Sequence, residues 1–406
     1  MNKKTITILA TLCIVSLTLS SCFQWGPRAF KNFPKETALD KTYNYNGKVI
    51  IIGAGAAGLA AAKILERNKV DYQVLEATDR YGGRLKKNET LADFPIDIGA
   101  EWIHNQAAIL NRLKGEKGDI TDEELIPYHL ESGLRWDGKK LEKISKKEID
   151  QRFEFFPEYK FKRSTWYDYV NENFAQEVKH KIKFNSPVTE VNYANDKVEV
   201  KTRNGEVFMA DKVLVTVSVG VLKSNNIKFI PDLSAEKKEA INAVGFLPGL
   251  KLFLKFSQKF YPDVVDLTHT DGEVVYYDIA FKKEAQSNIL GALFLGKSAE
   301  EYYRLDSEEK IVSAVLKELD QIFNGKASEF YSGEYVLENW GQHEFTKGTW
   351  VNAALDKNIN LKVLNQPLQK KVYFAGEVND VHQQMGVPGA LLSGYVVIDR
   401  LLTNEK

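Results

Sequence analysis

Cysteine is nearly absent from this chain. Its 406 residues include only two cysteines, Cys13 and Cys22, and both lie close to the N-terminus. A domain built from the residues that follow therefore has no disulfide, no thiolate metal site and no cysteine nucleophile. We expect a protein without a bound metal.

An excess of charge of either sign is also absent. Lysine plus arginine and aspartate plus glutamate each number 55, so the overall charge predicts no nucleic-acid partner. Apolar residues at 44% and charged residues at 27% are ordinary for a globular protein, which argues against long disorder or many membrane spans. The length favours two packed domains or one large two-part enzyme.

The first 22 residues differ from the rest. Two lysines precede an apolar stretch, residues 6–19, and small residues precede Cys22. This pattern resembles a bacterial lipoprotein signal peptide. It implies that Cys22 carries a lipid anchor, that residues 23–45 form a tether, and that the protein faces the periplasm or the exterior from a membrane of the bacterial cell envelope. An uncleaved anchor helix is the alternative, although the apolar run is shorter than the roughly 20 residues that span a bilayer.

A glycine-rich turn follows the first clear strand. The strand, residues 48–52, is β-branched, and an alanine-rich helix over residues 59–68 follows the turn. In this order the turn lets the backbone approach a pyrophosphate, while the helix N-terminus faces its negative charge. A second strand, residues 72–75, ends at Glu76, which is placed to bind a ribose hydroxyl. The predicted contacts of this dinucleotide site are Gly53, Gly55, Ala56, Ala57, Gly58 and Glu76.

The turn does not distinguish NAD from FAD, but the residues after it do. Residues 76–84 read E-A-T-D-R-Y-G-G-R and resemble the E-A-x-x-R-x-G-G-R run of the flavin-containing amine oxidase superfamily, which includes polyamine oxidases, monoamine oxidases and histone demethylases. The resemblance favours FAD. Two adjacent glycines let the backbone pass close to the pyrophosphate, and Arg84 supplies a cation beside it. The cofactor contacts that this run implies are Ala77, Arg80, Gly82, Gly83 and Arg84.

The C-terminal end carries a second set of matching segments. Residues 374–377 read F-A-G-E and residues 389–394 read G-A-L-L-S-G, similar to the terminal segment of the family, where a helix N-terminus faces the flavin. A third segment, residues 187–223, contains a hairpin that turns at 204–205 and a run similar to T-V-P-x-G-V-L-K with Ser218 in place of proline. The cofactor contacts implied here are Val188, Gly376, Glu377, Gly386, Val387 and Ala390.

Together these segments predict an α/β fold with a Rossmann-like FAD-binding domain that is discontinuous in sequence and an interwoven α+β substrate domain. We assign residues 46–105, 186–224 and 366–406 to the FAD-binding domain, and residues 106–185 and 225–365 to the substrate-binding domain. The first substrate block is rich in lysine, glutamate and aromatic residues, has no clear motif, and is shorter than the matching region of polyamine oxidases.

Residues of the substrate side are implied by two further resemblances. Residues 97–104 read D-I-G-A-E-W-I-H, similar to a stretch of spermine-type oxidases in which the matching histidine lies near the amine. A lone histidine is as often structural, so both roles stay open for His104. Lys251 lies in a segment similar to the one that carries the family lysine, which holds a water against flavin N5; an exposed strand lysine is the alternative. The cofactor contacts implied by residues 97–104 are Gly99, Ala100, Glu101 and Trp102.

The aromatic cage of the family is only partly present. Residues 340–350 match its W-x7-G-x-aromatic run, so Trp350 would form one wall beside the flavin, and Trp340 either contacts the cofactor or belongs to the core. Thr349 stands where monoamine oxidases have the cysteine that bonds to FAD, so FAD should be non-covalent. Gly386 stands where the opposite wall usually has a tyrosine or threonine, which predicts a cage open on one side.

The resemblance implies an FAD-dependent amine oxidase acting on a small-molecule amine. A hydride equivalent would move from the carbon beside nitrogen to the flavin, water would hydrolyse the imine, and O2 would reoxidise the flavin and give H2O2. Lys251, Trp350 and His104 would be the catalytic residues. Two alternatives stay open: an L-amino-acid oxidase or desaturase-type oxidase, and a membrane-tethered flavin-binding protein without turnover, which Gly386 and the short substrate block would suit.

Overall fold

A parallel five-stranded sheet carries the N-terminal motif. The computed structural model describes residues 33–104, 107–116, 124–155, 157–351, 360–380 and 386–403. The strands of this sheet run in the order β20-β13-β1-β2-β9, and all neighbours are parallel. Their bounds are β1 (Lys48–Ile52), β2 (Asp71–Leu75), β9 (Ile182–Lys183), β13 (Lys212–Val215) and β20 (Val372–Phe374). Strands from the two ends of the chain therefore share one sheet, as the discontinuous Rossmann-like prediction requires.

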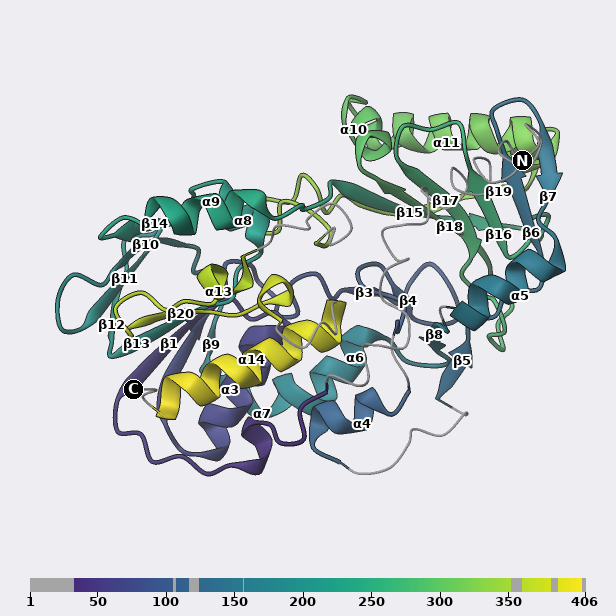
Figure 1. Ribbon diagram of the computed structural model, residues 1–406. Coiled ribbons are helices and arrows are strands. Elements are labelled where there is room, and N and C mark those ends of the chain that lie inside the picture. Colours follow the sequence, from purple (N-terminus) through teal and green to yellow (C-terminus); the bar gives the residue numbers. More distant parts are fainter. Residues whose placement is uncertain are drawn as a thin grey trace, which may run out of the picture.

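Two long helices cover one face of this sheet and pack on each other (Figure 1). They are α3 (Ala56–Arg67), which follows the glycine-rich turn, and α14 (Gly386–Thr403) at the C-terminal end. A Cβ at Gly394 would lie 2.4 Å from the carbonyl oxygen of Ala57, so the lack of a side chain at Gly394 allows the two helices to approach closely. The core on this side also includes apolar residues of α4 (Ile109–Lys114) and α6 (Trp166–Val170).

A four-stranded sheet lies next to the other face of the parallel sheet. Its order is β12-β11-β10-β14, and apolar side chains of both sheets form one cluster. Its strands are β10 (Val188–Asn192), β11 (Val198–Thr202), β12 (Val207–Ala210) and β14 (Lys228–Ile230). β11 and β12 pair antiparallel around residues 204–205, which confirms the predicted hairpin.

The second lobe is built on a seven-stranded sheet of order β19-β15-β18-β17-β16-β6-β7. Its strands are β6 (Gly133–Trp136), β7 (Leu141–Lys143), β15 (Gly249–Phe256), β16 (Val264–Leu267), β17 (Glu273–Asp278), β18 (Asn288–Leu295) and β19 (Tyr331–Glu338). α11 (Glu308–Phe323) and α10 (Lys297–Tyr303) lie over one face (Figure 1). In β15 the alternating residues Leu250, Leu252 and Leu254 pack under α11. Lys251 and Phe253 therefore point to the opposite face of the sheet.

Shorter elements connect the two lobes. β3 and β4 pair with each other, as do β5 and β8, and Figure 1 shows both pairs in the region between the lobes. The elements not yet named, whether between the lobes or within one of them, are η1 (Ala38–Asp40), β3 (Lys87–Asn88), β4 (Ile96–Asp97), β5 (Leu125–Pro127), α5 (Lys146–Phe155), β8 (Tyr159–Phe161), η2 (Asn171–Ala175), α7 (Gln176–Val178), η3 (Lys179–Lys181), α8 (Val219–Lys223), α9 (Ala235–Ala243), α12 (Lys326–Phe330), α13 (Leu361–Leu364) and η4 (Glu377–Asn379).

Three boundaries differ from the sequence-based assignment. Leu39 and Tyr43 are buried and Tyr43 donates to Asp399 of α14 at 2.6 Å, so residues 33–45 pack on the folded body instead of forming a free tether. β9 pairs with β2 and β14 with β10, although both were assigned to the substrate side. A two-residue and a three-residue strand carry too little periodicity to be assigned from sequence.

The expected leader, anchor and cysteines, residues 1–22, lie outside the described residues. Within the described part of the chain, no helix has the length and apolarity needed to cross a membrane. The same residues contain no cluster of histidine, cysteine, aspartate and glutamate that could hold a metal ion.

Candidate active site

One cavity of about 900 Å³ is lined by nearly every site residue that the sequence predicted. It extends from the glycine-rich turn, past Lys251, to the far strands of the seven-stranded sheet. All the predicted cofactor contacts line it except Gly58, and so do Lys251, Trp350 and His104. Gly58 instead has a packing role, because a Cβ there would lie 2.1 Å from the carbonyl oxygen of Gly53. This closeness supports the helix–strand packing that the glycine motif predicts.

The glycine-rich segments form an open cradle at one end of the cavity. Gly53 has φ 104° and Gly82 has φ 102°, backbone angles that favour glycine. Gly55 is the N-cap of α3 with φ −76°, and a Cβ there would have no neighbouring atom within 4 Å. A bridge joins Gly55 to Gly82, so the two glycine motifs lie side by side. The N-terminus of α3 therefore faces free space with its N–H groups, as an anion site requires.

Glu76 lies at the end of β2 beside this cradle and is buried. One carboxylate oxygen accepts from the backbone N–H of Ala54 at 2.8 Å. The other oxygen accepts from the N–H and hydroxyl of Thr78, both at 2.9 Å. An ionised carboxylate has about four lone-pair sites, so these three bonds fix its orientation and leave it able to accept one more. A ribose hydroxyl fits this acceptor.

The two arginines of the motif have different environments. Arg80 donates to the carbonyl oxygens of Tyr81, Gly83 and Leu85 at 2.7 to 3.2 Å, so its guanidinium holds the loop that presents the glycines. Arg84 donates to Glu377 at 2.7 Å and to the carbonyl oxygen of Thr349. Arg84 thus connects the N-terminal motif to two later segments, residues 340–350 and residues 374–377. Glu377 offsets part of its charge.

The start of α14 closes the cradle from the C-terminal side. Gly376 follows β20 with φ 155°, and its N–H donates to the buried Ser393 hydroxyl at 2.9 Å. Gly386 has φ 51° and a Cβ there would meet nothing within 4 Å. The open cradle, the helix N-termini and the oriented Glu76 carboxylate fit an elongated dinucleotide such as FAD, held by residues from both ends of the chain.

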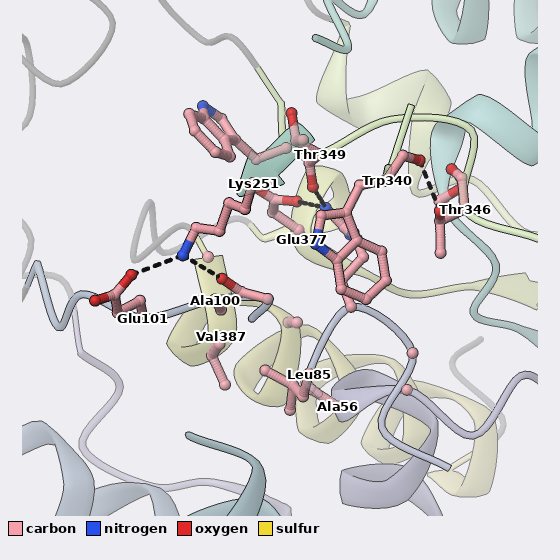
Figure 2. Close-up of a pocket in the computed structure, with 18 of the residues that line it drawn as sticks. Ala56, Leu85, Ala100, Glu101, Lys251, Trp340, Thr346, Thr349, Glu377 and Val387 are labelled. Atoms are coloured by element: carbon pink, nitrogen blue, oxygen red, sulfur yellow. Dashed lines mark hydrogen bonds and ion pairs between the residues drawn. The ribbon is translucent and has the colours of Figure 1, made fainter. Parts of the chain in front are cut away.

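Lys251 lines the cavity and is buried, with a relative exposure of 3%. Its ammonium donates to Glu101 at 2.7 Å and to the carbonyl oxygen of Gly99 at 2.9 Å. Figure 2 shows the side chain extended toward Glu101. The alternative of an exposed strand lysine is therefore wrong, because β15 places Lys251 on the sheet face that the cavity lines.

Glu101 is shared by a second lysine that the sequence did not reveal. Lys160 of β8 donates to its other oxygen at 2.6 Å, and the Tyr277 hydroxyl donates at 2.7 Å to the oxygen that binds Lys251. Burial raises the pKa of Glu101, but the cations of Lys160 and Lys251 outweigh it and lower the pKa to about 2. Burial lowers the pKa of Lys160, against the opposing effect of Glu101.

Three aromatic rings surround the Lys160 ammonium. Its Nζ lies 4.7 Å from the ring centroid of Trp102, 4.3 Å from that of Tyr128 and 4.7 Å from that of Tyr277. These distances are within the range of cation–π interactions. The rings line the cavity, whereas Lys160 itself lies behind them.

The remaining catalytic candidates take different positions. Trp350 is half-buried and packs on the apolar cluster that includes Phe253 and Tyr277. Trp340 is buried and donates from its ring nitrogen to the carbonyl oxygen of Ile98 at 2.9 Å, so it both lines the cavity and anchors residues 97–104. His104 is about half exposed and pairs with Glu158 at 2.7 Å.

Charged side chains line the outer part of the cavity, where β6, α5, β16 and β17 meet. Four carboxylates are present, against two guanidinium groups. Arg152 pairs with Asp266 at 2.9 Å, and both it and Arg135 pair with Glu148 at 3.3 and 2.5 Å. The outer cavity is therefore acidic when His104 is neutral. The four carboxylates are Glu154, Glu158, Asp266 and Glu273.

Sequence reasoning missed Lys160, Tyr128, Tyr277 and this outer group. The three-residue strand β8 shows too little pattern to mark Lys160, and nothing in the chain indicates that residue 160 meets residue 101. The one available signal is a lysine between two aromatic residues, Tyr159 and Phe161, which is weak by itself.

Comparison with known proteins agrees with this geometry. A family model described as flavin containing amine oxidoreductase matches residues 153–402, and one described as an NAD(P)-binding Rossmann-like domain matches residues 51–113. The solved structure of putrescine oxidase bound to putrescine superimposes with a TM-score of 0.69, at 16% identity over 88% of this chain and 99% of that chain. Cyclohexylamine oxidase from Brevibacterium oxydans gives 0.70, at 17% identity over 89% and 99%. These two likenesses show the fold.

Curated relatives match over most of this chain. Lysine-specific histone demethylase 2 of Homo sapiens is 26% identical over 88% of this chain, which spans only about half, 53%, of that protein. Probable polyamine oxidase 4 of Arabidopsis thaliana is 25% identical over 89% of both chains. The amine oxidoreductase model by itself covers more than half of the sequence. The chain belongs to the flavin-containing amine oxidoreductase family, and FAD is its cofactor.

Proposed function

We propose that this chain is an FAD-dependent oxidase of small amines that carry a second cationic group, such as diamines or polyamines. The observation that carries the proposal is the single cavity that joins the dinucleotide cradle, the Lys251 cluster and the acidic outer part. A substrate in this cavity would place one amine beside Lys251 and a distant ammonium among the outer carboxylates. The names of polyamine oxidase 4 and putrescine oxidase support the same substrate class.

When bound, FAD supplies the oxidant, which accepts a hydride equivalent from the carbon beside the amine nitrogen and is then reoxidised by O2 with release of H2O2. The chain's own residues prepare the amine for this step. The rings of Trp102, Tyr277 and Trp350 line the cavity and exclude water, and the loss of solvent favours a neutral amine. The cations of Lys160 and Lys251 outnumber the one carboxylate between them, which further disfavours an ammonium at this end. Restricted orientation in the cavity then brings the C–H bond toward the cradle.

Lys251 has a second role in the proposal. A buried cation stabilises negative charge that develops near it more strongly than an exposed one does. Lys251 is positioned to stabilise the charge that develops on oxygen during reoxidation. Its ammonium has three N–H donors, and two of them are engaged by Glu101 and Gly99, so one remains for groups in the cavity.

The arrangement is less suited to an L-amino-acid oxidase. Such a substrate needs a cation for its carboxylate, and the two arginines of the outer cavity, Arg135 and Arg152, are already paired with Glu148 and Asp266. Recruitment of Arg152 would leave the partly buried Asp266 carboxylate without its partner, and recruitment of Arg135 would remove one of the two guanidinium partners of Glu148.

We also propose that the protein is anchored by a lipid at Cys22 and faces the periplasm or the exterior. The support for this location is the leader pattern of the sequence. The fold begins to pack by Leu39, so fewer than 20 residues separate Cys22 from the folded body.

The amine oxidase proposal is tested by an anaerobic titration of the leaderless protein. Diamines, polyamines, monoamines and L-amino acids are added in turn while the absorbance band of the bound flavin is followed. We expect bleaching with diamines or polyamines at lower concentrations than with a monoamine of equal chain length. A flavin that stays oxidised with every amine would refute the proposal, and bleaching by L-amino acids alone would replace it.

A further inference from the structure

Glu101 has an unusual position for a residue next to a functional lysine. Its carboxylate receives three hydrogen bonds, from Lys160, Lys251 and Tyr277, and it is buried. A carboxylate that pairs with Lys251 fixes the position of its ammonium. The same carboxylate also cancels the positive charge of that ammonium toward any group in the cavity. A second cation on the same carboxylate removes this conflict.

Lys160 has the geometry to be that second cation. Its relative exposure is 5%, and it lies behind the rings of Trp102, Tyr128 and Tyr277, outside the residues that line the cavity. It therefore acts on a substrate or on oxygen only through other groups. Two lysines and one carboxylate leave the cluster with one net positive charge. Lys251 is the member of the pair that lines the cavity, so the net charge is presented there.

We propose that Lys160 is a positioning residue that sets the charge at Lys251: it neutralises Glu101 from behind the aromatic wall, so that Glu101 holds Lys251 in place without cancelling its charge. The inference rests on the proposed function insofar as it assigns that charge to the reaction of the reduced cofactor with oxygen. Lys160 and Glu101 thus act as a pair, in which Glu101 positions Lys251 and Lys160 neutralises the negative charge of Glu101.

Other ionisable groups surround the cluster and must be separated from it in any test. Burial, and after it the neighbouring Glu101, raises the pKa of Asp97 well above its usual value. Burial lowers the pKa of Lys283 to about 8, so Lys283 also titrates in the alkaline range. The other groups that influence Glu101, Lys160 or Tyr277 are Tyr128 and Asp278.

The test measures the rate at which O2 reoxidises the bound flavin after photoreduction, so that no amine is needed. Lys160→Met should remove the net charge of the cluster and slow reoxidation by about 10-fold or more, because a buried charge that stabilises the developing negative charge on oxygen is lost. Glu101→Gln combined with Lys160→Met restores a net charge of one, located on Lys251. We expect this double variant to recover most of the wild-type rate, whereas two independent structural defects would add.

The pH profile supplies a readout that a structural role would not move. Lys160 has a lowered pKa, so in the wild type its charge is lost at a lower pH than that of an ordinary lysine, and reoxidation should slow as pH rises. Lys160→Arg keeps the charge, because arginine stays protonated, and should move this alkaline limb to higher pH by at least about one unit. If the fall in reoxidation rate at alkaline pH comes instead from Lys283, it should occur at the same pH in Lys160→Arg as in the wild type. That result would overturn the inference.

Two variants serve as references. Lys63→Met removes another buried lysine, which also lies over an aromatic ring, Phe174, but is not part of the cavity; its reoxidation rate should match the wild type. Lys251→Met should be as slow as Lys160→Met. Equal rates in Lys251→Met and the wild type, or a double variant slower than Lys160→Met, would overturn the inference.

A failure of this inference can be told apart from a failure of the proposed function, because the two are tested by different measurements. If no amine bleaches the flavin, the amine oxidase proposal fails, while the reoxidation rates still decide the role of Lys160. The absorbance spectrum of the oxidised flavin gives a further comparison, since the spectrum of the double variant should resemble that of the wild type more closely than Lys160→Met does. If Lys160→Met binds no FAD, the role of Lys160 is still decided by the pH profile of Lys160→Arg and by the reoxidation rate of the double variant.

Discussion

Gly55 offers a way to separate cofactor binding from folding. It caps α3 with φ −76° and ψ −177°, angles that any residue adopts, and a Cβ there would meet no atom within 4 Å. Serine is a good N-cap, and the difference between serine and glycine at this position is only a few tenths of a kcal/mol. Gly55→Ser should therefore leave the apoprotein as stable as the wild type or slightly more stable.

The same substitution fills part of the cradle. The new side chain would occupy space that the cavity now offers and would compete for the N–H groups of α3. Crowding by added atoms in a packed site costs about 1–3 kcal/mol, which corresponds to an increase of about 5- to 150-fold in the Kd for FAD. The assay is a titration of apoprotein with FAD, followed by the quenching of flavin fluorescence, beside thermal unfolding of the same apoprotein.

Gly58→Ala is the matched comparison. Its Cβ would lie 2.1 Å from the carbonyl oxygen of Gly53, so α3 and β1 must move apart and the apoprotein itself should lose stability. The reasoning is refuted if Gly55→Ser binds FAD like the wild type, because the pyrophosphate would then lie elsewhere. It is also refuted if the two variants lose apoprotein stability equally.

Four further predictions follow from other parts of the molecule. Gly386→Tyr adds a wall where the cavity is open; at φ 51° it should cost about 1–2 kcal/mol of stability, and kinetic assays should show a larger loss of kcat/KM for bulky amines than for small ones. Glu273→Gln removes an acid of the outer cavity, so KM should rise about fivefold or less for a diamine and stay constant for a monoamine. The pKa of Glu101 is lowered to about 2 from 4.5, so its stabilising contribution is present above pH 4.5 and is lost as pH falls toward 2; acid unfolding curves of Glu101→Gln should lack this part of the slope. Cys22→Ser should move the full-length protein from the membrane fraction to the soluble fraction, and retention in the membrane would favour an uncleaved anchor helix.

Much of the dinucleotide side could be predicted from the sequence, because its signals are local. Backbone angles at Gly53 and Gly82 and the close contact at Gly58 restrict those positions to glycine, and such restrictions leave a recognisable spacing in the chain. β1 begins and ends where the β-branched run predicts. α3 begins three residues earlier than predicted, at Ala56, because glycine and alanine in the motif obscure the N-terminus of the helix.

The substrate side was only partly predictable, because its contacts join distant residues. The sequence indicated Lys251, but its partner Glu101 is 150 positions away, and Lys160 is 59 positions from Glu101. Glu101 was predicted as a cofactor contact; the structure places it on the cavity wall with its carboxylate engaged by three protein donors. Charge pairs of this kind depend on tertiary packing and leave no periodic pattern.

Residues 97–104 contact both the cofactor cradle and the lysine cluster around Glu101. Gly99 lies so close to the Arg84 backbone that a Cβ would be 1.9 Å from its carbonyl oxygen, and its own carbonyl oxygen accepts from Lys251. One residue earlier, Ile98 accepts from Trp340; two residues later, Glu101 joins Lys160 to Lys251. A displacement of this segment would therefore shift the cradle loop and the lysine cluster together. Because packed interiors deform little, the position of the cofactor and the charge presented to the substrate are set by the same short stretch of backbone.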